Sequence, residues 1–256
     1  MPHLETDGAN VFYEVWPAAA GTPWVTLLNG HARSLDDFRS MAAALNRRGF
    51  SVLSLDNRGS GKTEAFRKFS LRDIAADVRA VWKKVKCAKS HLAGFSYGGA
   101  VAMTVASERP PELEKLALIS TRATWDIALP NVAAPNFAEE IAKYFSKDFF
   151  EAQKSFITHF GAEVQKRAQD PDKRQGIAWQ REAVEGMDLL PQLTKITAPT
   201  LIIHGDEDRI VPYASAELIR KAIPGARLLT YPQVGHLPLV QCATKLFDDV
   251  ATFFGP

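Results

Sequence analysis

The residues best suited to chemistry are a serine, a histidine and a group of acids in three separate loops. Ser96 lies in Gly94-Phe95-Ser96-Tyr97-Gly98-Gly99, where an apolar run ends and a helical pattern begins. A sharp turn from strand to helix holds its central residue in a strained conformation with the side chain exposed, and Gly94 and Gly98 leave room for that turn. The stretch is typical of a nucleophile elbow, although turns of small residues are also common where no such chemistry occurs.

A serine hydroxyl needs a base, and the base needs an orienting group, before it attacks at neutral pH. Among six histidines, His236 is the best candidate base, because it follows the last predicted strand and ligands bind at the carboxyl ends of strands in open α/β sheets. The loop after another predicted strand contains three acids, Asp206, Glu207 and Asp208. A lone histidine is usually structural and acidic loops are common, so what favours catalysis is the shared chain order of Ser, acid and His.

Alternating strand and helix patterns must position these loops. Helical patterns separate short apolar runs, which predicts a mostly parallel, doubly wound α/β sheet with helices on both faces. An alternating pattern after Asp7-Gly8 predicts an antiparallel hairpin at one edge of the sheet. The expected parallel strands are Trp24 to Leu28, Phe50 to Leu55, His91 to Gly94, Leu116 to Ile119, Thr200 to Ile203 and Arg227 to Tyr231.

Two helices carry start signals of the capping-box type, in which a serine and an acid three residues later bond to each other's backbone amides. Ser34 with Asp37 predicts such a start between the first two parallel strands, and Ser70 with Asp73 predicts one before the third. Both serines precede apolar residues at helical spacing, so we expect a capped helix at each place.

Residues from about 125 to 188 break the alternation, with helical patterns but no clear strand. We therefore expect a core domain of residues 1–122 and 189–256 with a helical cap inserted at 123–188. Aromatic residues of the cap suggest an apolar pocket over Ser96, although most aromatics at helical spacing pack a helix onto its support. These aromatics are Trp125, Phe137, Tyr144, Phe145, Phe149, Phe150, Phe156, Phe160 and Trp179.

Composition excludes several classes of partner. The 256 residues are 46% hydrophobic and 23% charged, which is ordinary for a soluble globular protein. A net charge of +2 and basic runs of no more than two residues give no reason to expect nucleic acid. The start of the chain lacks a signal-peptide pattern and no apolar run is long enough to span a membrane, so we expect a cytoplasmic protein without a membrane partner. Cys87 and Cys242 lack metal spacing and are expected to be thiols.

These motifs resemble the α/β-hydrolase fold superfamily over nearly the whole chain. The elbow and the order Ser96, acid, His236 fit its pattern, as does Asp56-Asn57-Arg58-Gly59-Ser60-Gly61-Lys62-Thr63. In that family the acid stands three residues after a strand-ending glycine and four before a proline, which selects Asp208. The end of the 56–63 loop also imitates a phosphate-binding loop, but Asp56 stands where that loop needs a glycine, so we interpret its glycines as turn formers.

The resemblance also implies an oxyanion hole made by two backbone amides. Tyr97 follows the nucleophile and His31 lies in the loop after an early strand. Many relatives have His-Gly where this chain has Asn29-Gly30. Gly30 keeps the backbone free, and Asn29 is expected to brace the loop.

The resemblance implies a serine hydrolase for a carboxylic ester or similar small acyl substrate with an apolar moiety. Ser96, Asp208 and His236 would form the triad, and neither cofactor nor metal is needed. Serine at the elbow disfavours dehalogenases and epoxide hydrolases, which use aspartate there. Lactonase, acyltransferase or cofactor-free perhydrolase activity on the same triad remains open, as do a small-molecule receptor role and the oligomeric state.

Overall fold

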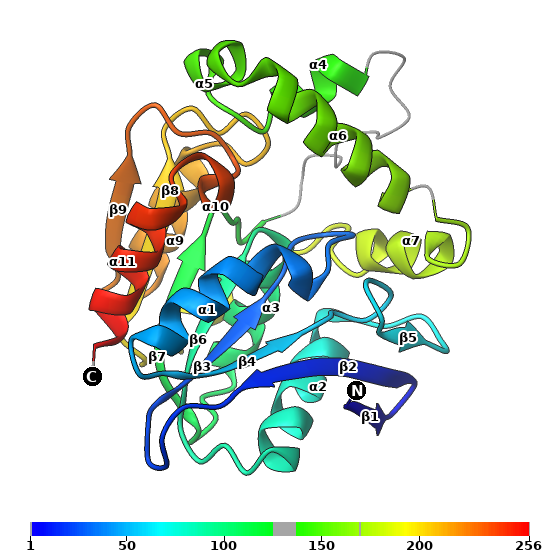
Figure 1. Ribbon diagram of the computed structural model, residues 1–256. Helices are drawn as coiled ribbons and strands as arrows, with labels where there is room; N and C mark the ends of the chain where they lie inside the picture. Colours follow the sequence, from blue (N-terminus) through cyan, green and yellow to red (C-terminus); the bar gives the residue numbers. More distant parts are fainter. Residues whose placement is uncertain (1, 125–136, 169, 256) are drawn as a thin grey trace.

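A mostly parallel sheet forms the centre of the molecule (Figure 1). The computed structural model describes residues 2–124, 137–168 and 170–255. Within them the strands run in the spatial order β1-β2-β4-β3-β6-β7-β8-β9, and the short β5 pairs with β2. Parallel pairing from β4 to β9 and an antiparallel β1-β2 hairpin confirm the predicted fold class. The strands are β1 (His3–Thr6), β2 (Ala9–Trp16), β3 (Trp24–Leu28), β4 (Ser51–Leu55), β5 (Glu64–Ala65), β6 (Ser90–Phe95), β7 (Leu113–Ile119), β8 (Thr200–Gly205) and β9 (Arg227–Tyr231).

The register of the central strands sets three functional loops side by side. Leu28 at the end of β3 pairs with Leu55 at the end of β4 and with Gly94 near the end of β6. Because these strands are parallel and end at one level, the loops that follow them leave the sheet together at its carboxyl edge. The loop at 29–34, the loop at 56–63 and the elbow are therefore neighbours.

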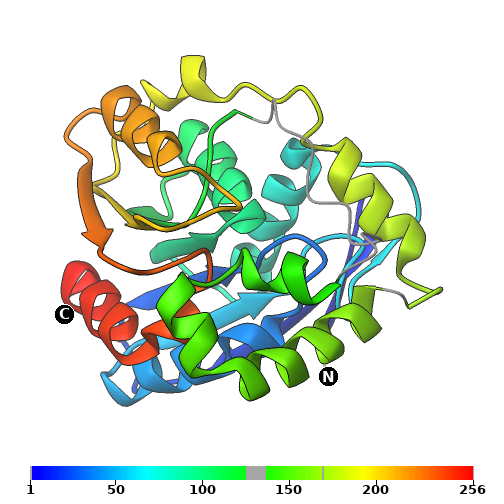
Figure 2. The same ribbon diagram turned by 90° about the horizontal axis from the view of Figure 1, so that it is seen from above.

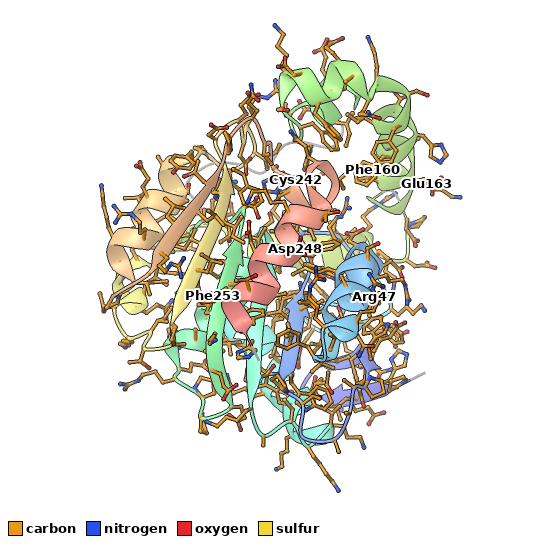
Figure 3. All side chains as sticks on the ribbon, turned by 60° about the vertical axis from the view of Figure 1, so that its left-hand side comes forward. Arg47, Phe160, Glu163, Cys242, Asp248 and Phe253 are labelled. Atoms are coloured by element: carbon orange, nitrogen blue, oxygen red, sulfur yellow. The ribbon has the colours of Figure 1, made fainter. Side chains whose placement is uncertain are left out.

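Helices cover both faces of the sheet, as the view from above in Figure 2 shows. The apolar cluster on one face includes residues of α1 (Arg39–Arg47) and α11 (Ala243–Phe254). In Figure 3 these two helices run side by side, with Arg47 and Asp248 labelled, and an ion pair between Arg48 and Asp248 joins them. The cluster on the other face includes residues of α2 (Leu71–Lys84), α3 (Tyr97–Ser107), α8 (Leu190–Leu193) and α9 (Ala214–Ala222).

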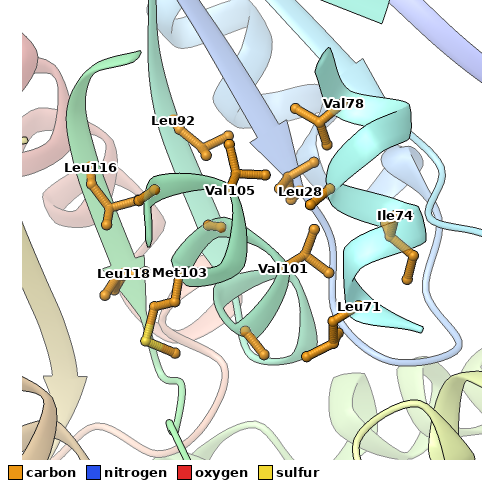
Figure 4. Packing of buried hydrophobic residues seen from close by; sticks show 14 of the residues in the cluster. Leu28, Leu71, Ile74, Val78, Leu92, Val101, Met103, Val105, Leu116 and Leu118 are labelled. Carbon is orange, nitrogen blue, oxygen red and sulfur yellow. The ribbon is translucent and has the colours of Figure 1, made fainter. Parts of the chain in front are cut away.

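The helix that follows the elbow is held by the core along its whole length. Every residue of α3 is buried, and in Figure 4 its Val101 and Val105 face side chains of α2 and of the strands. Burying an apolar side chain of this size contributes about 1.5 to 3 kcal/mol, so the packing fixes α3 firmly. Because α3 is held rigidly, it fixes the position of Ser96, which is the N-cap residue of this helix.

One of the two predicted capping boxes is confirmed and the other is wrong. Ser70 and Asp73 form a reciprocal capping box at the start of α2. Ser34 makes no side-chain cap, and the chain there forms a 3-10 turn, η1 (Leu35–Phe38), before α1. Two competing bonds explain the difference, because the carboxylate of Asp37 pairs with Arg33 and Ser34 Oγ donates instead to Asp36 Oδ2 at 3.1 Å.

Of the five helices described between β7 and β8, the first four form a layer above the carboxyl ends of the strands (Figure 1). A bridge between Thr124 and Asp188 brings the two ends of this segment together. Trp125 and the side chain of Phe137 lie outside the part of the chain that can be described. The four helices are α4 (Phe137–Ala142), α5 (Lys147–Ala152), α6 (Lys154–Ala168) and α7 (Arg174–Glu182).

Helix α7 touches the core through bare backbone. A Cβ added to Gly59 would lie 2.5 Å from the carbonyl oxygen of Gly176, and one added to Gly176 would lie 2.4 Å from the Cα of Gly59. No L-side chain fits between backbones this close. Among the described helices none is long and apolar enough to cross a membrane, and Cys87 and Cys242 are free thiols, as expected.

Candidate active site

The backbone strain expected at Ser96 is present. Ser96 has φ 52° and ψ −117°, a conformation that L-residues avoid unless the surrounding structure holds them there. A Cβ at Gly94 would lie 2.3 Å from the Gly98 carbonyl oxygen, and a Cβ at Gly98 would lie 2.2 Å from that of Leu28. Both positions therefore require glycine, since strand β6, helix α3 and the end of β3 approach closely around the elbow.

The structure brings Ser96, His236 and Asp208 together in one chain of hydrogen bonds. His236 Nε2 lies 3.1 Å from Ser96 Oγ, and His236 Nδ1 lies 2.8 Å from Asp208 Oδ2. The three side chains come from the loops after β6, β8 and β9, which all leave the carboxyl edge of the sheet. His236 precedes α10 (Pro238–Gln241), is 2% exposed and packs against the rings of Phe95 and Tyr144. This is the geometry in which an imidazole takes a proton from a serine.

The other two acids of the loop after β8 face elsewhere. Asp206 Oδ1 accepts a hydrogen bond from the amide of Gln233, which holds the turn before His236. Glu207 accepts one from the amide of Lys147 at the start of α5. Asp208 is therefore the carboxylate of this loop that meets the imidazole of His236.

Asp208 is ionised by its surroundings. Burial alone would raise its pKa, but the attraction of His236 and hydrogen bonds from His204 and His236 outweigh burial and hold the pKa of Asp208 below its usual range. Its Oδ1 also accepts from the amides of Ile210 at 2.9 Å and Val211 at 2.8 Å. A carboxylate held in this way orients and stabilises a neighbouring imidazolium.

A second histidine that sequence reasoning missed also touches this acid. His204, the second-last residue of strand β8, has no exposed surface, and its Nε2 lies 3.2 Å from Asp208 Oδ2. The only sequence signal was its place four residues before Asp208, because both residues then leave the same strand end.

Hydrogen bonds brace the loop that is expected to supply part of the oxyanion hole. Asn29 is fully buried and its Nδ2 donates to the Leu55 carbonyl at 3.4 Å, while Asn57 Nδ2 donates to Asn29 Oδ1 at 2.7 Å. The rings of His31 and Tyr97 lie 6.1 Å apart, so the two backbone segments that carry the expected amides are adjacent. Their amides remain the predicted oxyanion donors.

Helix α7 contacts the same loop. Gln180 is fully buried, and its Oε1 accepts the Ala32 amide at 2.9 Å while its Nε2 donates to the Arg58 carbonyl at 2.7 Å. The ring of His31 lies with Nε2 3.4 Å from the Ile177 carbonyl oxygen. Loss of hydration lowers the pKa of His31 to about 4 despite this bond, so His31 is neutral at pH 7. The role of Gln180 was missed because its partners lie more than a hundred residues away.

The 56–63 loop is a structural brace. Asp56 accepts the amides of Leu35 at 2.6 Å and Lys62 at 2.7 Å, and Thr63 Oγ1 donates to its carbonyl. Burial raises the pKa of Asp56 to about 6. The Lys62 amide and the Thr63 hydroxyl, which belong to the stretch that resembled a phosphate-binding loop, therefore bond within the loop itself. This agrees with the interpretation of its glycines as turn formers.

Comparison with known proteins identifies the class. The sheet order and the elbow are those of an α/β-hydrolase, and solved α/β-hydrolases superimpose on the whole chain. Residues 22–241 match the model of the family described as serine aminopeptidase, S33. The chain therefore belongs to this family of the α/β-hydrolase superfamily.

Three similar proteins illustrate the range of the class. A non-heme haloperoxidase from Rhodococcus erythropolis is 29% identical over 274 residues, covering 99% of both chains. Lipase 3 from Moraxella sp. (strain TA144) is 25% identical and covers 96% of this chain and 81% of its own. The crystal structure of an enol-lactonase from Burkholderia xenovorans LB400 has a TM-score of 0.85 at 25% identity, covering 99% of both chains.

Proposed function

We propose that this hydrolase cleaves a carboxylic ester or similar small acyl substrate through an acyl-enzyme on Ser96. The observation that carries the proposal is the continuous bond chain from Ser96 Oγ through both nitrogens of His236 to Asp208. Two similar proteins are named a lipase and an enol-lactonase, which supports the ester and lactone classes of acyl substrate. Residues 123–188 are proposed as the cap over the acyl pocket.

The reaction has two halves with balanced proton transfers. His236 takes the Ser96 proton as Oγ bonds to the substrate carbonyl carbon, and the imidazolium then gives that proton to the departing alcohol as the ester bond breaks. A water molecule next gives a proton to His236 as its oxygen bonds to the acyl carbon, and the imidazolium returns that proton to Ser96 Oγ as the acyl–serine bond breaks and the acid leaves. Asp208 keeps the proton of neutral His236 on Nδ1 and stabilises the imidazolium.

The amides of Tyr97 and His31 would stabilise the negative oxygen of each tetrahedral intermediate. Losing one such donor costs about a hundredfold to a thousandfold in turnover in enzymes of this type. The hydrogen bonds to Asn29 and Ala32 hold the His31 amide in place. The loop after β3 would therefore contribute to catalysis through its backbone.

Turnover of short aryl esters tests the proposal. Ser96→Ala and His236→Ala should each reduce kcat by roughly a millionfold, and the double variant should lose little more, because the two residues act as a unit. Ser155→Ala, an exposed serine on α6, is the matched control and should keep full activity. Turnover that survives in Ser96→Ala refutes the proposal, and one slow turnover per molecule in the unaltered enzyme favours a receptor.

A second measurement, made with the unaltered enzyme, determines the substrate class. A panel of esters of varied acyl size, lactones, thioesters and amides should give the highest kcat/KM for esters with a short apolar acyl group. A higher value for lactones, or transfer to hydrogen peroxide in preference to water, would move the assignment to lactonase or perhydrolase on the same residues.

A further inference from the structure

We propose that His204 is a positioning residue for the catalytic acid, one that shares Oδ2 of Asp208 with His236. This inference rests on the proposed function of Ser96, His236 and Asp208. The contacts of His204 are with Val211, Asp208 and Tyr213, and not with Ser96 or His236. It therefore acts on the site through the carboxylate of Asp208.

The hydrogen-bond partners of His204 fix its tautomer. Its Nε2 lies 2.9 Å from the carbonyl oxygen of Val211 and 3.2 Å from Asp208 Oδ2. A carbonyl oxygen only accepts, so Nε2 carries the hydrogen and divides it between two oxygens. Nδ1 is buried, and no residue in 2–124, 137–168 or 170–255 gives it a partner. A second hydrogen there would be a buried donor without an acceptor, which is costly, so the ring is neutral.

His204 completes the set of donors around Asp208. The amides of Ile210 and Val211 hold Oδ1, while the rings of His236 and His204 hold Oδ2 from two directions. Without His204, the base itself would be the remaining donor to Oδ2 among the described residues. The acid would then follow His236 as that ring gains and loses its proton, instead of orienting it.

An ordinary core residue would serve packing better than this histidine does. His204 has no exposed surface and leaves one nitrogen unbonded among described residues, a cost that leucine or phenylalanine would avoid. The ring meets Tyr213 edge-on at 6.0 Å between centroids, which an apolar ring could also do. What an apolar ring cannot supply is the donor to Asp208. Among the described residues, the titratable groups that face His204 are Asp208 and Tyr213.

Losing the donor has a directional effect on pH dependence. Without the N–H of His204, the negative charge on Asp208 Oδ2 would have one donor fewer and would attract the imidazolium of His236 more strongly. Protonated His236 cannot act as base, so the acidic limb of kcat/KM moves to higher pH. Because His204 does not contact substrate, kcat falls and KM stays nearly constant; misplacement of a catalytic group can cost up to about a hundredfold.

The test compares His204→Gln, His204→Leu and His204→Phe on an aryl ester between pH 5 and 9. Gln presents an amide N–H near the place of Nε2, so it should regain most of the kcat that Leu and Phe lose and restore the acidic limb. His91→Leu is the matched control for losing a buried histidine, because His91 stacks on Phe254 and lies outside the site. Equal kcat in all variants, or equal losses in Gln and Leu, would overturn the proposal.

A second readout separates this inference from the proposed function. In the free enzyme, the proton NMR signal of the His236 Nδ1–H reports its bond to Asp208 and requires no turnover. The signal should shift in His204→Leu and His204→Phe, return toward its original position in His204→Gln, and stay unchanged in His91→Leu. An enzyme that is inactive on every ester but shows these shifts refutes the function alone, whereas an unmoved signal in all folded variants refutes the role of His204.

Discussion

At the scale of single residues, the direction in which each acid of one loop points decides its chemistry. Asp206 and Asp208 are two residues apart, yet Asp208 is 6% exposed and meets His236, while Asp206 binds the amide of Gln233 at the surface. Chemistry at this site therefore depends on the fold of the loop more than on its acidic composition.

Replacing each acid by its amide separates the two roles. Asp208→Asn should lower kcat by about ten-thousandfold, because an amide favours the wrong tautomer of His236. Asp206→Asn keeps an oxygen for the Gln233 amide and should stay within about twofold, as surface changes usually do. Steady-state kinetics on one aryl ester decides between them, and a larger loss in Asp206→Asn would reject the assignment of the acid.

His31 gives the enzyme a pH-dependent stability that is separate from its activity. The pKa of His31 is about 4 in the folded protein and 6.5 in the unfolded chain, so unfolding takes up a proton between these values. The protein therefore loses stability as the pH falls from 7 toward 4, by about 1 to 2 kcal/mol at pH 5 from this residue.

Urea unfolding at pH 7 and pH 5 measures this effect. His31→Gln, which does not titrate, should lose less stability than the unaltered protein between the two values. His91 has a similarly lowered pKa and remains in both proteins, so the difference isolates His31. Parallel losses in the two proteins would show that His31 is protonated in the fold.

At the scale of elements, two glutamines join the segment between β7 and β8 to loops at the carboxyl edge of the sheet. Gln180 on α7 bonds to Ala32 and Arg58, and Gln241 on α10 bonds to Ser146 before α5 and to the amide of Gly235 beside His236. The segment between β7 and β8 is thus connected to the loop after β3 by one side-chain amide and to the loop that carries His236 by another. Its helices therefore help to position these loops.

Gln180→Leu tests the first connection. The variant leaves the half-buried amide of Ala32 and the buried carbonyl of Arg58 unbonded, which should cost about 1 to 3 kcal/mol in unfolding free energy. The kcat should also fall, because the loop with His31 loses its brace. Gln153→Leu, an exposed position in the cap, is the control for added apolar surface and should change neither value. Loss of stability with unchanged kcat would limit Gln180 to a structural role.

The two capping signals show which parts of an element could be predicted. Ser70 and Asp73 depend only on each other, so a local pattern was enough. Ser34 failed because its hydroxyl donates to Asp36 and the carboxylate of Asp37 pairs with Arg33, so neither half of the box forms. The strands and the elbow follow from periodicity and turn chemistry, whereas Gln180, His204 and the bonds of Asp56 depend on tertiary contacts that no local pattern contains.

At the scale of the whole molecule, a buried ion pair joins the loop after β4 to helix α2. Arg58 donates to both carboxylate oxygens of Asp77, at 2.5 and 2.8 Å, and both side chains are almost fully buried. The Arg58 carbonyl also receives Gln180, so the pair lies beneath the attachment of α7. Arg58 therefore links the stability of the core to the position of helix α7.

Removing one partner leaves the other charge buried without compensation. Asp77→Ala should cost about 3 to 5 kcal/mol in urea unfolding, and the double change Arg58→Met with Asp77→Leu should recover most of that loss. Glu14→Ala breaks an exposed pair with Arg39 and should cost at most about 1 kcal/mol. A small loss in Asp77→Ala would mean that water reaches Arg58.

The bare backbone contact between Gly59 and Gly176 has a consequence for protein engineering. A cap transplanted from a relative would fit this core only if it brought a glycine, or an equally close backbone, to the place of Gly176, because a Cβ there would lie 2.4 Å from the core. Helices α4, α5 and α6 carry no part of this contact. A library that varies substrate preference can therefore vary the exposed positions of those three helices, keeping the buried Ile141 and Ile157, while Gly176 of α7 is left unchanged.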